Sequence, residues 1–336
     1  MRTLLRLLSL FLALALPTVA RAQQKLEVGY IPVLGISQLF VIVGEGWDKE
    51  AGLELKLIRF DSGPVMIQAL SGKQLDAYYG GIGPVIVARG SDIDARVIAN
   101  TAIEEMTVVA TGPFAKTLEE NKSVTAAIAA FTKAEGRKPK FSTQPLGSVP
   151  DTTLRYWLQK VSSVELATVD IVGMGIDKTQ QAVLAGAVDA ATIREPALTL
   201  VREKDPQIKL VALGGQMFPK QPGSVVAVTG EALKAKGAAL AKLVALHVRA
   251  TELIKKEPER AAKHAHHYLG RGLTDVATIR RALTSPSSQF AADPHEIVES
   301  TRIMQDFQIS MGVLKKPVPM EQLFDFSLWS GVKSGK

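Results

Sequence analysis

Four short turns pair a glycine with residues that can hold a small polar ligand. Glycine lets a ligand approach the backbone closely, and a helix that begins at such a turn directs unpaired N–H groups and a partial positive charge outward. Any one of these turns is also typical of an ordinary loop with a helix cap. Four of them at the ends of predicted strands favour a single polar cleft. The turns are Leu34-Gly35-Ile36-Ser37-Gln38, Asp61-Ser62-Gly63, Gly80-Gly81-Ile82-Gly83 and Gly147-Ser148-Val149, the last followed by Asp151 and Thr152.

A doubled motif adds charge to this set. The stretches "LSGKQLDAYYGGIGP" (70–84) and "LAGAVDAATIREP" (184–196) share Leu, a small residue, Gly, then Asp-Ala and a later Pro. In each copy we expect a helix to stop at the glycine and a short strand to start at the aspartate. The first copy ends on backbone amides, whereas the second ends on Arg194 and Glu195. The two copies predict the two sides of a clamp.

Other chemistries find little support in the sequence. His264, His266 and His267 stand on one predicted helix, but adjacent positions face different sides and no pair is spaced i, i+4. This pattern favours a solvated helix face over a metal site. The chain has no G-x-S-x-G nucleophile elbow and no P-loop, and Gly81-x-Gly83 lacks the third glycine of a dinucleotide motif. We therefore expect no catalytic residue, no metal and no cofactor.

Strand-like and helix-like segments alternate along the chain, which is typical of α/β layers with parallel strands. The first series predicts strands at 26–32, 53–60, 76–79, 96–102 and 106–111. The second series predicts strands at 140–143, 168–172, 189–193, 208–213 and 224–230. From residue 231 the chain is predicted to be helical, with breaks near Pro258, 270–272, Pro286 and Pro294.

Two series followed by a helical tail indicate two lobes. The tail is too poor in strands to form a lobe of its own, so we assign it to the first. The expected division is 25–112 with 226–336 as lobe I, and 113–225 as lobe II. The chain would then cross between the lobes near Thr111-Gly112 and Val228-Thr229, and two crossings form a hinge.

The first 22 residues are typical of a secretory signal peptide. Arg2 and Arg6 flank an apolar run at 7–16, and Ala20-Arg21-Ala22 supplies a cleavage site. We expect cleavage after Ala22 and a periplasmic mature chain. The sequence contains no cysteine, so we expect no lipid anchor. The net charge of +7, or +4 without the leader, is too diffuse to predict a nucleic-acid surface.

The stretch at 29–86 resembles the substrate-binding proteins of ABC importers in the nitrate, taurine and aliphatic-sulfonate group. Matching marks are Pro32 after the first strand, Ala51-Gly52-Leu53 after the first helix, the turn at 69–77 and Gly83-Pro84; "LAGAVDAATIREPALT" repeats the mark in the second lobe. The resemblance covers nearly the whole mature chain. It implies an α/β, type II periplasmic-binding-protein fold, in which two lobes, each a mixed five-stranded sheet flanked by helices, are joined by two crossing strands.

The resemblance also implies where a ligand would be held between the lobes. Glu195 stands at a position that is often acidic in relatives, which suits an amine or another hydrogen-bond donor and disfavours a plain anion unless Arg194 balances the charge. Alternatively, Glu195 caps the helix that starts at Pro196 and faces solvent. The implied ligand-binding residues are Gly35, Ser37, Gln38, Asp61, Ser62, Gly81, Ile82, Thr101, Gly147, Ser148, Thr152, Arg194 and Glu195.

The function implied is capture of a small anionic or zwitterionic ligand, such as an aliphatic sulfonate, taurine or a nitrate-like ion. The expected partners are the permease and ATPase subunits of an ABC importer in the inner membrane, with the binding protein itself a monomer. One alternative is an enzyme on the same fold, similar to thiamine-pyrimidine synthases, although those use a cysteine-rich segment and this chain has no cysteine. Another is a ligand-sensing partner of a membrane receptor, which the sequence does not separate from a transport protein.

Overall fold

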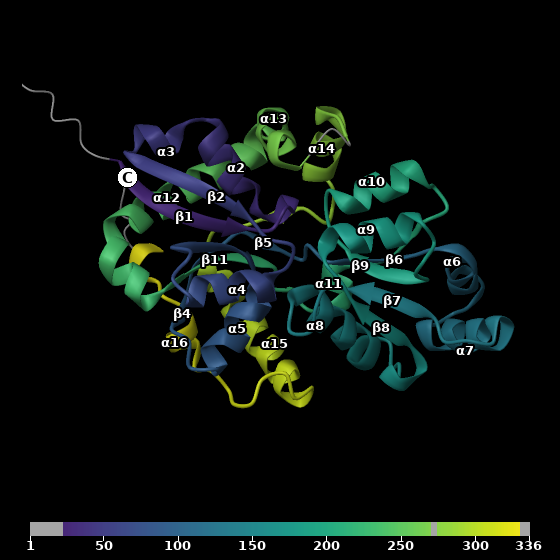
Figure 1. Ribbon diagram of the computed structural model, residues 1–336. Helices are drawn as coiled ribbons and strands as arrows, with labels where there is room; N and C mark the ends of the chain where they lie inside the picture. Colours follow the sequence, from purple (N-terminus) through teal and green to yellow (C-terminus); the bar gives the residue numbers. More distant parts are fainter. Residues whose placement is uncertain (1–22, 270–273, 330–336) are drawn as a thin grey trace, which may run out of the picture.

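The computed structural model describes residues 23–269 and 274–329, so the predicted signal peptide lies outside the described residues. Two five-stranded mixed sheets, each flanked by helices, form two lobes that lie side by side (Figure 1). The predicted fold class is confirmed.

The sheet of lobe I has the strand order β2-β1-β3-β11-β4. Strand β1 is parallel to β2 and β3, whereas β11 is antiparallel to β3 and β4. Helices cover both faces, so β3 is buried along its whole length and is mostly apolar and glycine. The elements are β1 (Gln24–Tyr30), η1 (Leu34–Ile36), α2 (Ser37–Gly44), α3 (Trp47–Glu50), β2 (Leu53–Arg59), α4 (Gly63–Ser71), β3 (Ala77–Gly81), α5 (Ile82–Gly90), β4 (Ala95–Asn100) and β11 (Ser224–Thr229).

The sheet of lobe II has the strand order β10-β6-β9-β7-β8. Strand β7 is parallel to β8 and β9, and β6 is antiparallel to β9 and β10. The elements are β6 (Thr107–Ala110), α6 (Gly112–Glu120), α7 (Val124–Glu135), β7 (Lys140–Thr143), α8 (Val149–Tyr156), η2 (Trp157–Val161), η3 (Leu166–Thr168), β8 (Asp170–Gly173), α9 (Ile176–Leu184), β9 (Ala190–Ile193), α10 (Ala197–Lys204), β10 (Lys209–Leu213) and α11 (Gly214–Met217).

Both predicted crossing points are wrong by a few residues. Strand β6 pairs in the second sheet, so the first crossing precedes Thr107 instead of falling near Thr111-Gly112. Strand β11 pairs in the first sheet, so the return precedes Ser224 instead of falling near Val228-Thr229. The two crossing segments lie against each other, because the Glu104 N–H donates to the Gln221 carbonyl at 2.9 Å.

The helical tail packs on lobe I and also contacts α8 and α10 of lobe II. It comprises α12 (Gly230–Lys256), α13 (Pro258–Leu269), α14 (Val276–Leu283), η4 (Pro294–Ile297), α15 (Val298–Ser310) and α16 (Met320–Leu323). A two-residue strand, β12 (Gln289–Phe290), pairs with β5 (Ala102–Ile103). The predicted break at 270–272 lies outside the described residues.

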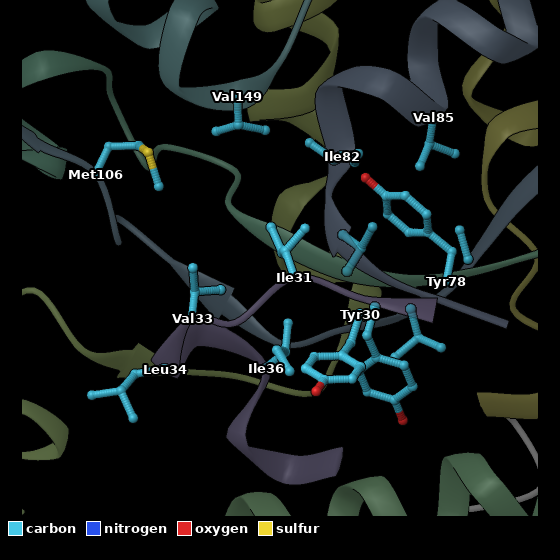
Figure 2. Packing of buried hydrophobic residues seen from close by; sticks show 14 of the residues in the cluster. Tyr30, Ile31, Val33, Leu34, Ile36, Tyr78, Ile82, Val85, Met106 and Val149 are labelled. Carbon is cyan, nitrogen blue, oxygen red and sulfur yellow. The ribbon is translucent and has the colours of Figure 1, made fainter. Parts of the chain in front are cut away.

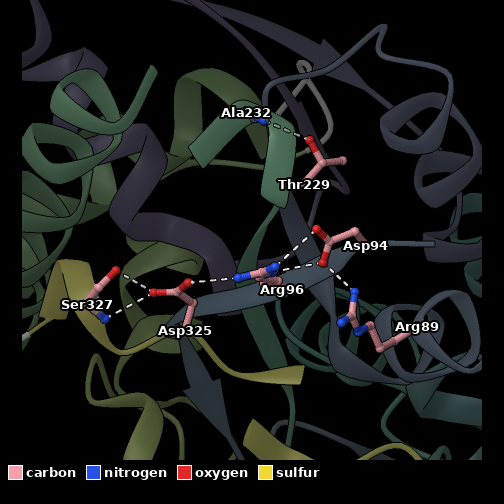
Figure 3. A network of polar contacts seen from close by, with 7 residues as sticks. All are labelled: Arg89, Asp94, Arg96, Thr229, Ala232, Asp325 and Ser327. Carbon is pink, nitrogen blue, oxygen red and sulfur yellow. Dashed lines mark hydrogen bonds and ion pairs between the residues drawn. The ribbon is translucent and has the colours of Figure 1, made fainter. Parts of the chain in front are cut away.

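Ion pairs fasten the end of the tail to the edge of the first sheet (Figure 3). Arg96 of β4 donates to Asp94 at 2.8 Å and to Asp325 at 3.3 Å, and Arg89 also pairs with Asp94. The Asp325 N–H donates to the Val97 carbonyl at 2.9 Å. The end of the tail is therefore linked to the start of β4.

Candidate functional site

The predicted turns of the two lobes meet between the two sheets. The Leu34 N–H, after β1, donates to the Glu195 carbonyl, after β9, at 3.0 Å. The Ile176 N–H, at the start of α9, donates to the Asp61 carbonyl at 3.4 Å. Both contacts join a turn at the carboxyl end of a lobe I strand to a turn of lobe II. This is the position where open α/β sheets bind ligands.

Apolar side chains line the inner part of this junction. Figure 2 shows Ile31, Val33, Met106 and Val149 directed toward one another, and all four are buried. They belong to one cluster of buried apolar residues that runs through both lobes. An apolar wall with a few polar groups is the usual composition of a small-molecule site.

A buried ion pair lies at the centre of the junction. Arg194 Nη1 contacts Glu105 Oε1 at 3.1 Å, and each side chain is 3% exposed. The Ser224 hydroxyl donates to the same carboxylate oxygen at 2.5 Å. Arg194 was predicted as a site residue, whereas Glu105 was not. The signal that could have found it is the acid pair Glu104-Glu105 between two apolar strands.

Glu195 is buried and does not face solvent. Its Oε2 accepts the Thr199 N–H at 3.0 Å, so the carboxylate does cap the first turn of α10, and its Oε1 accepts the Ser287 hydroxyl at 3.4 Å. Burial raises the pKa of the Glu195 carboxyl, although hydrogen bonds from Ser285, Thr199 and Ser287 oppose that rise. The structure thus combines the capping role with a place beside the junction.

The lobe I candidates divide into buried and exposed groups. Ser37, Gln38 and Thr101 are fully buried, and Gln38 Nε2 donates to the Thr101 carbonyl at 2.8 Å. The hydroxyls of Ser37 and Thr101 have no hydrogen-bond partner among the described residues. Ser62 is also buried, whereas the Asp61 side chain is 68% exposed and pairs with Arg59.

Gly35 and the β3–α5 turn make close contacts. A Cβ on Gly35 would lie 1.9 Å from Glu105 Oε2, and one on Gly81 would lie 2.9 Å from the Val149 side chain. The Ile82 N–H donates to the Gly223 carbonyl at 3.0 Å. These positions bring the backbone close to neighbouring protein residues.

The lobe II candidates of α8 are already engaged by protein. The Ser148 hydroxyl accepts the Asp151 N–H at 3.3 Å and so caps α8. Gln308 Nε2, on α15, donates to the Thr152 hydroxyl at 3.2 Å and to the Gly147 carbonyl at 3.4 Å. Gly147 and Thr152 therefore contribute to contact between the lobes in this arrangement.

A cavity of about 280 Å³ opens beside the ion pair, between Arg194 to Ala197 on one side and Tyr268 on the other. A much smaller one, about 10 Å³, lies deeper and shares Ile176, Arg194 and Ala197 with it. At the rim, Arg59 Nη2 of lobe I pairs with Asp177 Oδ2 of lobe II at 2.6 Å. The arrangement can enclose a small solute beside Arg194 and exclude water from it.

The histidine cluster of α13 forms separate contacts. His264 Nε2 lies 2.6 Å from Glu45 Oε1, and His266 Nε2 lies 2.8 Å from the Thr274 carbonyl. The part of the chain that the structure describes has no group of three His, Cys, Asp or Glu side chains placed to hold a metal ion. Within the same residues, each helix is too short or too polar to span a bilayer.

Known binding proteins share this architecture. The periplasmic nitrate-binding protein NrtA from Synechocystis PCC 6803 superposes with a TM-score of 0.78 at 13% identity, covering 92% of this chain and 88% of that one. The alkanesulfonate-binding protein SsuA from Xanthomonas axonopodis pv. citri, bound to MOPS, gives 0.72 at 16% identity and covers 92% and 100%. A ligand-binding component of an ABC-type import system from Staphylococcus aureus gives 0.73 at 14% identity and covers 94% and 99%.

Sequence comparison extends over nearly the full length. The chain is 24% identical over 328 residues to a protein of Brucella abortus that is named only as a candidate binding protein, covering 93% of this chain and 94% of that protein. Residues 20–268 match the NMT1-like family, and the chain belongs to this family.

Proposed function

We propose that this chain is the solute-binding component of an ABC importer and holds a small organic solute between its two lobes. The observation that carries the proposal is the meeting of strand-end turns from both sheets around the buried Arg194–Glu105 pair. The family and the fold of the solved relatives support it. Residues 1–22 would direct export, and the mature chain would act in the periplasm beside a permease and an ATPase.

The ligand class we favour is an anionic or zwitterionic compound with an organic part, such as an aliphatic sulfonate or taurine. Arg194 supplies a buried guanidinium that lines both cavities of the junction. The apolar residues that line these cavities with it include Met106, Ile176 and Ala197. An inorganic ion such as nitrate has no apolar surface to bury against them, so an organic solute would bind with a larger hydrophobic contribution.

A thermal-shift screen of the mature protein tests the proposal. The panel contains alkanesulfonates, taurine, nitrate, bicarbonate, phosphonates, aromatic acids and amines. A true ligand at about one hundred times its Kd should add about 2.7 kcal/mol to the free energy of unfolding. Arg194→Gln should abolish the response, whereas Arg202→Gln, an exposed arginine on α10, should leave it intact. Failure of every compound to raise the melting temperature would contradict the proposal.

A transport protein and a ligand sensor would use the same binding site and would differ in the membrane protein that they contact. Under our proposal, deletion of the gene removes uptake of the radiolabelled hit by whole cells. Uptake that persists while a transcriptional response to the hit disappears would favour the receptor alternative.

A further inference from the structure

The carboxylate of Glu105 is held in place by side chains from two other segments of the chain. Glu105 belongs to the first crossing segment, between β5 and β6. Its Oε1 accepts hydrogen bonds from Ser224, on β11, at 2.5 Å and from Arg194, after β9, at 3.1 Å. Because all three side chains are buried and come from both lobes, the carboxylate has a defined direction at the lobe junction.

The second oxygen of this carboxylate, Oε2, accepts no hydrogen bond from the described residues. Glu105 Oε2 is buried and has no hydrogen-bond partner among residues 23–269 and 274–329. A buried acceptor without a partner destabilises the protein, and the cost is larger when the acceptor is charged. A ligand donor that fills the position would recover this free energy.

Glycine at two positions lets the backbone pack directly against the carboxylate. A Cβ at Gly35 would lie 1.9 Å from Oε2, and a Cβ at Gly223 would lie 2.9 Å from Oε1. The surrounding turns hold further buried polar atoms that lack partners in the described chain, namely Ser37 Oγ, Thr101 Oγ1 and Arg194 Nε. The hydroxyl oxygens among them can accept N–H donors as the carboxylate does.

The charge balance at the junction disfavours a bare anion. Arg194 is already paired with Glu105, and a second acid, Glu195, follows Arg194 directly. Two buried carboxyl groups thus accompany one buried guanidinium, whereas Lys204 and the Arg59–Asp177 pair line the more exposed part of the cavity. A ligand that carries its own cation or N–H donor improves this balance, whereas an added anion worsens it.

We propose that Glu105 selects the ligand: its free Oε2 receives an N–H donor of the solute, in the simplest case a protonated primary amine. This inference rests on the proposed function and narrows it to amine-bearing solutes, zwitterions included. Glu105 acts through contact with the ligand, and Arg194 and Ser224 act by orienting Glu105.

Matched pairs of compounds test the inference by isothermal titration calorimetry. The pairs are taurine with ethanesulfonate, β-alanine with propionate, and benzylamine with benzyl alcohol. For the wild-type protein, the amine member of a pair that binds should do so at least about tenfold more tightly than its amine-free partner. Glu105→Gln keeps the size of the side chain and an acceptor for Ser224 but removes the charge, so this preference should fall to about twofold or less.

Glu104→Gln is the matched control. Glu104 is the neighbouring acid in the same crossing segment, but its Oε2 accepts a hydrogen bond from Gln289 at 2.9 Å in an exposed contact. The preference of this variant should equal that of the wild type. If Glu105→Gln does not fold, as judged by circular dichroism, Glu105→Asp retains the charge and should bind more weakly with the amine preference kept.

The possible outcomes distinguish the proposed role of Glu105 from the proposed solute-binding function. Equal or tighter binding of the amine-free compounds to the wild type, or an unchanged preference in Glu105→Gln, overturns the role of Glu105 and leaves the binding function standing. Binding of nitrate or another plain anion with no amine bound does the same. A wild-type protein that binds neither these pairs nor any solute of the wider screen contradicts the binding function first, and the inference with it.

Discussion

At the scale of single residues, His247 lies directly behind the lobe I turns. It is fully buried on α12, where its Nε2 lies 2.8 Å from the Asn100 carbonyl and its Nδ1 lies 3.4 Å from the Tyr79 hydroxyl. A neutral ring satisfies both contacts, donating from Nε2 and accepting at Nδ1. Burial lowers the pKa of His247 from 6.5 to about 4, against the opposing effect of the Asn100 carbonyl.

This depressed pKa predicts a loss of stability in acid. As the pH falls from about 6.5 to about 4, the unfolded chain takes up a proton on His247 that the folded chain refuses, which removes about 3 kcal/mol from the free energy of unfolding. Urea unfolding between about pH 7 and about pH 4 should therefore show a shallower pH dependence for His247→Gln than for the wild type. His267→Gln, at an exposed position, should follow the wild type. Parallel curves for the wild type and His247→Gln would contradict this account.

At the scale of the elements, the sequence predicts local structure well and pairing poorly. The strand predicted at 140–143 matches β7, and most other strands differ by one or two residues, because alternation of apolar segments with glycine turns is a local signal. Strand β6 belongs to the second sheet because it pairs with β9 and β10. Both of these strands come later in the chain, at a distance of up to about a hundred residues. The pattern of β6 alone carries no information about those partners, so the crossing was misplaced.

The same argument explains what was missed at the site. Turn glycines and hydroxyls can be recognised from their neighbours in sequence, and Arg194 follows a repeated motif. Glu105 becomes significant only through Arg194 and Ser224, which are 89 and 119 residues away. Local spacing in the sequence does not distinguish a carboxylate with such distant partners from an acidic residue on the surface.

The start of α5 gives a prediction at this scale. Gly83 lies against the turn before α8, where a Cβ would stand 2.7 Å from the Gly147 carbonyl and 3.2 Å from the Val149 nitrogen. Both atoms are backbone, so a methyl group there forces α5 and α8 apart. Gly83→Ala should lower the free energy of unfolding by about 1–3 kcal/mol, measured by urea titration.

A second glycine supplies the control for this variant. Gly237 lies in α12, and a Cβ there would meet nothing within 4 Å. Gly237→Ala should leave the stability unchanged or raise it by up to about 1 kcal/mol, since alanine is the better helix former. Equal stability of Gly83→Ala and the wild type would show that the α5–α8 contact can yield.

At the scale of the whole molecule, ion pairs at the rim add to the buried contacts between the lobes. Arg59 pairs with Asp177 across the opening, and Arg281 of α14 pairs with Glu203 of α10 at 2.8 Å. These pairs are partly exposed, and exposed ion pairs contribute only about 0.2–1 kcal/mol each. A bound solute that touches both lobes shifts the equilibrium between open and closed arrangements by its differential affinity for the two.

The Arg59–Asp177 pair should therefore have a small effect on the equilibrium between the open and closed arrangements of the lobes. Asp177→Asn should favour the open arrangement by up to about fivefold in the ligand-free protein, visible as a larger radius of gyration in small-angle X-ray scattering. Raising the salt concentration to about 1 M should open the wild type in the same direction, since the screening length falls to about 3 Å. Glu120→Gln, which breaks a pair with Lys116 inside α6, should leave the radius unchanged. If Asp177→Asn and the wild type scatter identically at low salt, and salt has no effect on either, closure depends on the buried junction around Glu105 and Arg194 alone.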